Sequence, residues 1–318
     1  MMTLSVYWDA WWHEAVGRES FWIPPHLGIY AGLFVSLGGF LLILDQYRTK
    51  LPRSLWVYAV GIAGIVGSGY ADELWHQKFG IETVGTLASL WSPTHVGALV
   101  SGSIAAIGVI LYLLRISRED NRLGWLVAAQ FGVLVSVVTL LLLPLGPETP
   151  FRILGIWGAP LVAFAILTMR FFGSVLSEKQ WALSLITLFN WMGNAILLSG
   201  HSSSVLLAQL LTVGLVPPLL ADLIIHRGRM LKTVKTAYVW AGLVWGVIFG
   251  TFFYPLTNSL TFLNETYALD APSLAIIGVT SAAASVLAGF IAGSKSQQWM
   301  ITRTLLVTRT EISAGARV

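Results

Sequence analysis

Two segments of the chain carry the same chemistry-bearing residues, one aspartate and two histidines, in the same order. In each segment an Asp-x3-His pair is followed by a loop and then by Pro-x-His. The residues are Asp9, His13 and His26 in the first segment and Asp72, His76 and His95 in the second. Aspartate and histidine are rare in so apolar a chain, so their recurrence indicates an internal repeat of a polar site over 9–28 and 72–97.

The spacing of these residues predicts how they are positioned. An Asp and a His four positions apart share one face of a helix. Proline is common in the first helical turn, so Pro24 and Pro93 predict that His26 and His95 begin the following helices. One carboxylate and two imidazoles at neighbouring helix ends match the ligand set of open-sided iron or copper sites. Each Asp can alternatively orient a ligating histidine.

Simpler interpretations exist for parts of this pattern. An Asp-x3-His pair at a helix end is commonly an ion pair in the headgroup region. The tryptophans near both segments are typical of an aromatic belt at the membrane interface. These are Trp8, Trp11, Trp12, Trp22, Trp75 and Trp91. Repetition of the polar residues with the Pro-x-His ending favours a metal site for the two aspartates and four histidines.

Further polar residues are candidates for orienting the ligands. Glu19 and Glu82 align between the two segments. A weaker group is formed by Asn190, Asn194 and His201, for which hydrogen bonding between helices is the simpler interpretation. We interpret Asp222 and His226, which repeat the four-residue spacing, as a juxtamembrane ion pair.

Composition predicts an all-α, polytopic transmembrane helical bundle. The chain has 318 residues, of which 56% are hydrophobic and 11% are charged, and its mean hydropathy is +0.75. Such values indicate a membrane protein, and apolar runs long enough to cross a bilayer recur throughout. We predict one integral membrane domain over 1–318, with about nine spans near 23–44, 55–76, 93–115, 123–144, 152–170, 180–199, 204–225, 236–256 and 272–294.

Two residue types restrict the chemistry. The chain has no cysteine, which excludes disulfides, thiolate metal sites and c-type haem attachment. The six methionines are scattered, so there is no methionine-rich cluster of the kind that selects Cu(I).

Basic residues predict the orientation of the spans, because Lys and Arg concentrate in cytoplasmic loops. Of the 19 basic residues, Arg18, Lys78 and Arg152 fall on one side, and all others, including Arg170, fall on the opposite side. We therefore expect the N-terminus outside, a cytoplasmic tail over 295–318, and both polar segments at the extracytoplasmic face of the cell membrane. The basic surplus is a topology signal and does not indicate nucleic-acid binding.

The first segment resembles a known metal-site motif. Asp9-x3-His13-x12-His26, with Arg18-Glu19 and Pro24-Pro25-His26 inside it, is similar to the copper-site motif in the C subunit of the copper-dependent membrane monooxygenases. That family includes particulate methane monooxygenase, ammonia monooxygenase and hydrocarbon-oxidising relatives. The family motif occurs once per subunit, whereas here it occurs twice, and the second copy has 18 residues between its histidines.

The resemblance implies a copper-binding membrane protein that oxidises ammonia or a small hydrocarbon with dioxygen, together with other monooxygenase subunits. Iron or haem is the alternative cofactor, since histidines at helix ends can also clamp a haem. A haem-binding or metal-handling protein without oxygenase activity is therefore the alternative function. A transporter that uses the same Asp and His residues is a third.

Overall fold

A computed structural model gives the arrangement of most of the chain. It describes residues 1–16, 20, 22–47, 51–80, 91–117, 120–146, 153–197, 199, 203–253, 261–262, 265–266 and 269–315. The long helices are α1 (Met2–Ala15), α2 (Pro24–Gln46), α3 (Arg53–Phe79), α5 (Pro93–Ile116), α6 (Gly124–Leu142), α7 (Gly158–Ser177), α8 (Ala182–Leu197), α10 (Val216–Met230), α11 (Val234–Ile248) and α13 (Ala271–Gly315).

Short elements complete the described part. Helix α9 (Ser203–Gln209) continues through a π-helical segment, Leu210–Leu215, into α10, and a second π-helical segment, Phe249–Phe253, ends α11. Single 3₁₀ turns occupy Asn121–Leu123, Leu143–Leu145 and Gly155–Trp157. Strands β1 (Thr261–Phe262) and β2 (Glu265–Thr266) form a minimal antiparallel pair.

The structure confirms an all-α polytopic bundle. Within the described residues, 8 helices are long and apolar enough to cross a membrane. They correspond to every predicted span except the one at 180–199. There the structure has α8, an apolar helix of 16 residues. Helix α1 has 14 residues and is not among the candidate spans.

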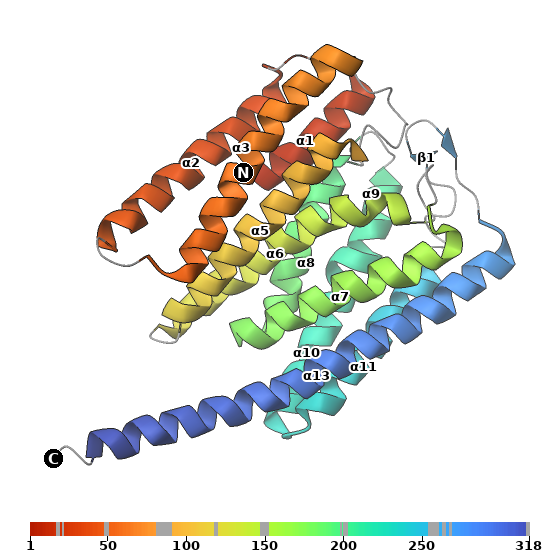
Figure 1. The fold of residues 1–318 in the computed structure, drawn as a ribbon. Coiled ribbons are helices and arrows are strands. Elements are labelled where there is room, and N and C mark those ends of the chain that lie inside the picture. The colour runs from red at the N-terminus through yellow and green to blue at the C-terminus, as the bar shows by residue number, and fades with distance from the viewer. Residues whose placement is uncertain are drawn as a thin grey trace.

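The helices form a bundle with the two N-terminal hairpins on one flank (Figure 1). Helix α3 packs along α5, and α5 packs on α6. Helix α1 lies between α2 and α8, so the short N-terminal helix is wedged against the bundle. Helices α6, α7 and α8 form the middle, and α10, α11 and α13 the other flank, with α13 packed along both α7 and α11.

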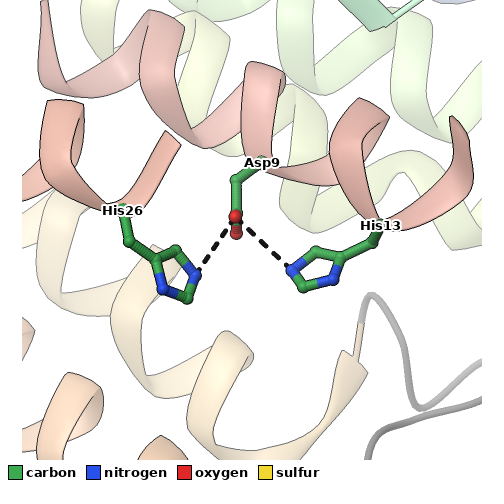
Figure 2. Close-up of side chains that lie close together, drawn as sticks. All are labelled: Asp9, His13 and His26. Atoms are coloured by element: carbon green, nitrogen blue, oxygen red, sulfur yellow. Dashed lines mark ion pairs between the residues drawn. The ribbon is translucent and has the colours of Figure 1, made fainter. Parts of the chain in front are cut away.

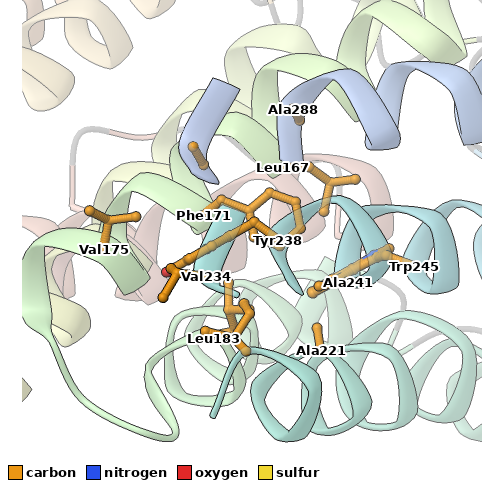
Figure 3. Close-up of a cluster of buried hydrophobic side chains, with 12 residues drawn as sticks. Leu167, Phe171, Val175, Leu183, Ala221, Val234, Tyr238, Ala241, Trp245 and Ala288 are labelled. Carbon is orange, nitrogen blue, oxygen red and sulfur yellow. The ribbon is translucent and has the colours of Figure 1, made fainter. Parts of the chain in front are cut away.

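The largest buried cluster lies where α7, α8, α10, α11 and α13 meet (Figure 3). The Phe171 ring packs edge-on against Tyr238 and Trp245, at centroid distances of 5.8 and 6.3 Å. Burying a large side chain removes it from the surrounding medium and contributes dense packing, which is the main force between helices in lipid. This cluster therefore packs the five helices of this flank together.

Two polar residues lie differently from expectation. Arg170, expected in a cytoplasmic loop, lies inside α7 with 3% of its surface exposed. Its Nη2 donates to Asn190 Oδ1 at 2.5 Å, and its guanidinium stacks 5.1 Å from the Trp245 ring centroid. The expected loop position was wrong because α7 extends to Ser177 and the side chain finds its partners within the bundle.

Asp222 is also buried, with 1% of its surface exposed. Its carboxylate accepts bonds from the backbone of Leu183 and from the backbone and hydroxyl of Ser184. It therefore caps the start of α8, where backbone N–H groups lack partners. The interpretation as a juxtamembrane ion pair with His226 was wrong, because α10 packs beside α8 and turns the carboxylate inward.

Candidate metal centre

The first Asp-His-His group, which we call triad I, comes from α1 and α2. Asp9 and His13 are one helical turn apart on α1, and His26 is the third residue of α2. Asp9 Oδ1 lies 3.4 Å from His13 Nε2 and 3.1 Å from His26 Nε2. Figure 2 shows the carboxylate projecting between the two imidazoles, with all three side chains converging on one point.

Triad I is mostly shielded from solvent. The side chains of Asp9, His13 and His26 are 16, 16 and 20% exposed. Asp9 Oδ1 is buried and accepts no hydrogen bond of good geometry. Burial raises the pKa of Asp9, but the neighbouring His13 and His26 imidazoles lower it more, so the pKa lies well below the usual aspartate value. The group is thus a carboxylate facing two imidazole nitrogens.

The second group, triad II, comes from α3 and α5. Asp72 and His76 lie near the end of α3, and His95 is the third residue of α5. Asp72 Oδ2 lies 3.3 Å from His76 Nε2, and Asp72 Oδ1 lies 3.4 Å from His95 Nε2. The side chains are 18 to 25% exposed. Triad II therefore brings together the same three residue types as triad I, on a different helix pair.

A turn at the end of α3 helps to set the orientation of His76. Gly80 adopts a φ of +78°, a backbone conformation that favours glycine. Its carbonyl oxygen lies 3.3 Å from His76 Nδ1. When Nδ1 carries the proton and donates to this carbonyl, Nε2 keeps its lone pair and faces Asp72.

The geometry of the two triads is closely similar. The imidazole centroids are 6.3 Å apart in triad I and 6.4 Å in triad II, with interplanar angles of 58° and 56°. Within each triad, one ligand atom per residue lies within 4.8 Å of the other two. In the described residues the six predicted ligands form two groups of three.

Both helix pairs approach closely at corresponding small residues. A Cβ added to Gly28 would overlap Ser5 Oγ, and one added to Gly97 would overlap Ser68 Oγ. Each serine precedes its aspartate by four positions, and each glycine follows its second histidine by two. Small residues allow helix backbones to approach in membranes. This close approach brings the second histidine within reach of the Asp-x3-His face.

Each triad is fastened to α6 by a different side chain. The Tyr7 ring is fully buried, and its hydroxyl donates to Ser136 O at 2.8 Å. Trp91, just before α5, donates from Nε1 to Leu141 O at 2.9 Å. The positions that correspond to them are exposed, since Tyr70 is 69% and Trp22 is 68% exposed. The two triads therefore share their ligand geometry but not their anchors.

The remaining predicted residues lie outside the triads or outside the described residues. Glu19, Glu82 and His201 belong to the residues that the structure does not describe. Asn190 accepts from Arg170, and its Nδ2 donates to Thr139 Oγ1 at 3.1 Å. Asn194 lies one turn further along α8 and is partly buried. Asn190 therefore takes part in the hydrogen bonding between helices that was the simpler interpretation.

The sequence analysis missed two residues near the triads, Thr94 and Tyr30, which carry a hydroxyl and a phenol group. Thr94 donates to Asp72 Oδ1 at 2.5 Å. The Tyr30 ring centroid lies 6.1 Å from that of His26, and the charges of Asp9 and Asp72 both act on the Tyr30 hydroxyl. Thr94 could have been found from its place inside the Pro-x-His ending, whereas Tyr30 has no such pattern.

Comparisons with known proteins add nothing to this geometry. No family model, no curated protein and no solved structure matches the chain. The site therefore has to be interpreted from its own residues.

Proposed function

We propose that this membrane-spanning protein binds one transition-metal ion at each triad. The observation that carries the proposal is the spacing between carboxylate oxygen and imidazole nitrogen, 3.1 to 3.4 Å in all four contacts. Two ligand atoms that each lie about 2.1 Å from a metal are about 3.0 Å apart at a right angle and about 3.4 Å apart at the tetrahedral angle. The four contacts fall within this range.

The types of ligand atom restrict which metals these sites can bind. Two imidazoles and one carboxylate on adjacent helix ends leave coordination positions open, as in non-haem iron and some copper sites. The chain offers no thiolate, because it has no cysteine. Copper is our leading assignment, supported by the resemblance of Asp9-x3-His13-x12-His26 to the monooxygenase C-subunit motif.

The reaction that we propose is monooxygenation of ammonia or a short hydrocarbon. One atom of dioxygen enters the substrate and the other leaves as water, with two protons and two electrons from an external donor. Bound copper would supply the redox chemistry of oxygen activation. The chain's own residues would hold the ion, keep the imidazole Nε2 atoms directed at it, and limit water access through their burial. A surrounding bilayer would concentrate an apolar substrate near the site.

Haem binding is disfavoured by one feature of both triads. An axial pair of histidines needs the porphyrin plane between its two nitrogens. In triad I that space contains Asp9 Oδ1, within 3.4 Å of both Nε2 atoms. A carboxylate in this position suits a small cation and not a macrocycle. A metal-handling protein without oxygenase activity uses the same two sites, and only an activity measurement separates it from an oxygenase.

The test of metal binding is elemental analysis of the protein in nanodiscs. We expect two copper ions per chain, and one after Asp9→Ala or Asp72→Ala. Glu73→Gln is the matched control, because Glu73 adjoins Asp72 but lies outside the triad and accepts a hydrogen bond from Gln77. A folded protein that takes up neither copper nor iron contradicts the proposal. Incorporation of labelled oxygen from dioxygen into product tests the oxygenase chemistry separately.

The proposed extracytoplasmic position of the triads can be tested in intact cells that express the protein. Because the chain has no cysteine, a cysteine introduced at one position is its only thiol. Labelling of that thiol shows on which side of the membrane the position lies. We expect an impermeant maleimide to label Ser199→Cys from outside the cell and Ser117→Cys only after permeabilisation. The reverse pattern would place the triads at the cytoplasmic face.

A further inference from the structure

The start of the second helix differs between the two triads. Triad I has Ile23-Pro24-Pro25-His26, and triad II has Ser92-Pro93-Thr94-His95. The prolines and histidines correspond, but two apolar positions of triad I are hydroxyl residues in triad II. Both hydroxyl residues are buried, with Ser92 1% and Thr94 8% exposed.

These two hydroxyls form a connected set of hydrogen bonds that ends at the carboxylate. Ser92 Oγ accepts from the backbone N–H of His95 at 3.1 Å and so caps α5. It also lies 2.9 Å from Thr94 Oγ1. Thr94 Oγ1 in turn donates to Asp72 Oδ1. The helix cap, the ligand histidine and the ligand carboxylate are therefore linked. Pro25 has no hydroxyl and cannot make the corresponding bond in triad I.

The carboxylates accordingly present different atoms to their imidazoles. In triad I a single oxygen, Asp9 Oδ1, faces both histidines. In triad II the two oxygens are divided, since Oδ2 faces His76 and Oδ1 faces His95. The oxygen that Thr94 holds is Oδ1. A donor on one oxygen fixes the rotation of the carboxylate and directs the other oxygen toward His76.

We infer that Thr94, backed by Ser92, is a positioning residue for the Asp72 carboxylate and makes the two triads unequal metal sites. The inference rests on the proposed function. Hydrogen bonds to a ligating carboxylate orient it, and their loss typically costs about 10- to 100-fold in metal affinity. At the position that corresponds to Thr94, triad I has Pro25, which offers no hydroxyl to Asp9. Thr94 therefore determines metal affinity at triad II without being a ligand.

The test isolates triad II in an Asp9→Ala background and measures Cu(II) affinity in a buffered titration. Thr94→Val keeps the branched shape but removes the hydroxyl, and we expect the Kd at triad II to rise about 10- to 100-fold. Thr94→Ser keeps a hydroxyl and should restore most of the affinity. Ser103→Ala is the matched control, because Ser103 lies on the same helix and bonds only to Leu99 O.

Spectroscopy separates positioning from a general loss of stability. The electron paramagnetic resonance spectrum of Cu(II) at triad II should change in Thr94→Val and return in Thr94→Ser. In an Asp72→Ala background, Thr94→Val should leave Cu(II) affinity at triad I within about twofold, because the hydrogen bonds of Thr94 run to Ser92 and Asp72. An unchanged Kd and spectrum in Thr94→Val would overturn the inference while metal binding stands. No uptake by the wild-type chain would overturn the proposed function and the inference with it.

Discussion

The helix pairs α1–α2 and α3–α5 present the same three ligands from very different frameworks. Helix α1 has 14 residues and is held against the bundle by the buried Tyr7. Helix α3 has 27 residues, is a candidate membrane span and packs along the length of α5. Even so, the distance between the two imidazole centroids is nearly the same, 6.3 Å in triad I and 6.4 Å in triad II.

This difference teaches that the ligand geometry is local to each helix pair. It needs an Asp-x3-His turn, a helix that starts at Pro-x-His, and a serine–glycine contact that brings the two helices together. The length of the first helix and the way the pair is anchored can vary. Affinity and accessibility can then be tuned separately at each triad, through the residues that differ.

The largest effect is expected from removing a histidine ligand. His13→Ala should abolish binding at triad I only, and His76→Ala at triad II only, because each ion would keep just two of its three protein ligands. Elemental analysis of the two variants should give one metal ion per chain, and none in the double variant. If either single variant lost both ions, the triads would be one coupled site and the comparison would fail.

Acidification should release metal from both triads. An imidazole must be unprotonated to bind a metal, so affinity falls as pH falls, by about tenfold per pH unit for each imidazole that must lose a proton. The depressed pKa of Asp9 keeps its carboxylate ionised at the pH values at which imidazoles take up protons. Protonation of the histidines therefore controls the release of metal at triad I. Cu(II) titrations at several pH values check the slope. Affinity that is independent of pH would exclude the histidines as ligands.

A smaller effect that is confined to triad I is expected from Tyr7→Phe. The change removes the bond to Ser136 O, worth about 1 kcal/mol, and loosens α1. We expect the Kd at triad I to rise about fivefold, with triad II unchanged. Tyr70→Phe is the matched control at the corresponding exposed position. Equal losses at both triads would show that Tyr7 stabilises the whole bundle instead.

The smallest effect is expected from Trp91→Phe, which removes the bond to Leu141 O. Trp91 lies just before α5, so its bond directly helps to position only His95. Asp72 and His76 lie on α3, which packs along α5. The Kd at triad II should rise about two- to threefold, within the range of a single net hydrogen bond. Trp22→Phe, at the corresponding exposed position, should change neither triad. A larger loss would mean that α6 positions the triad more tightly than α3 does.

The sequence predicted the members of each triad and every candidate span, although it also predicted a span at 180–199 where the structure has a shorter helix. Both kinds of prediction depend on local patterns. Apolar length identifies a span, and Asp-x3-His with Pro-x-His places three side chains by helical periodicity alone. The positions of Arg170 and Asp222 could not be predicted in this way. Their hydrogen-bonding partners, Asn190 and Ser184, lie on another helix. Only the packing of the bundle shows that a charged residue has such a partner. The sequence shows that Thr94 carries a hydroxyl, but its hydrogen bond to Asp72 depends on how closely α3 and α5 approach.

The buried guanidinium of Arg170 bears on how the chain is assembled in the membrane. Placing an arginine at the centre of a single helix costs about 2.5 to 3.5 kcal/mol when that helix enters the bilayer alone. The partners that offset this cost, Asn190 and Trp245, belong to helices that are synthesised after α7. The contacts that offset this cost can therefore form only once α8 and α11 have been inserted. The three ligands of each triad, by contrast, come from a single helix pair that precedes α7 in the chain.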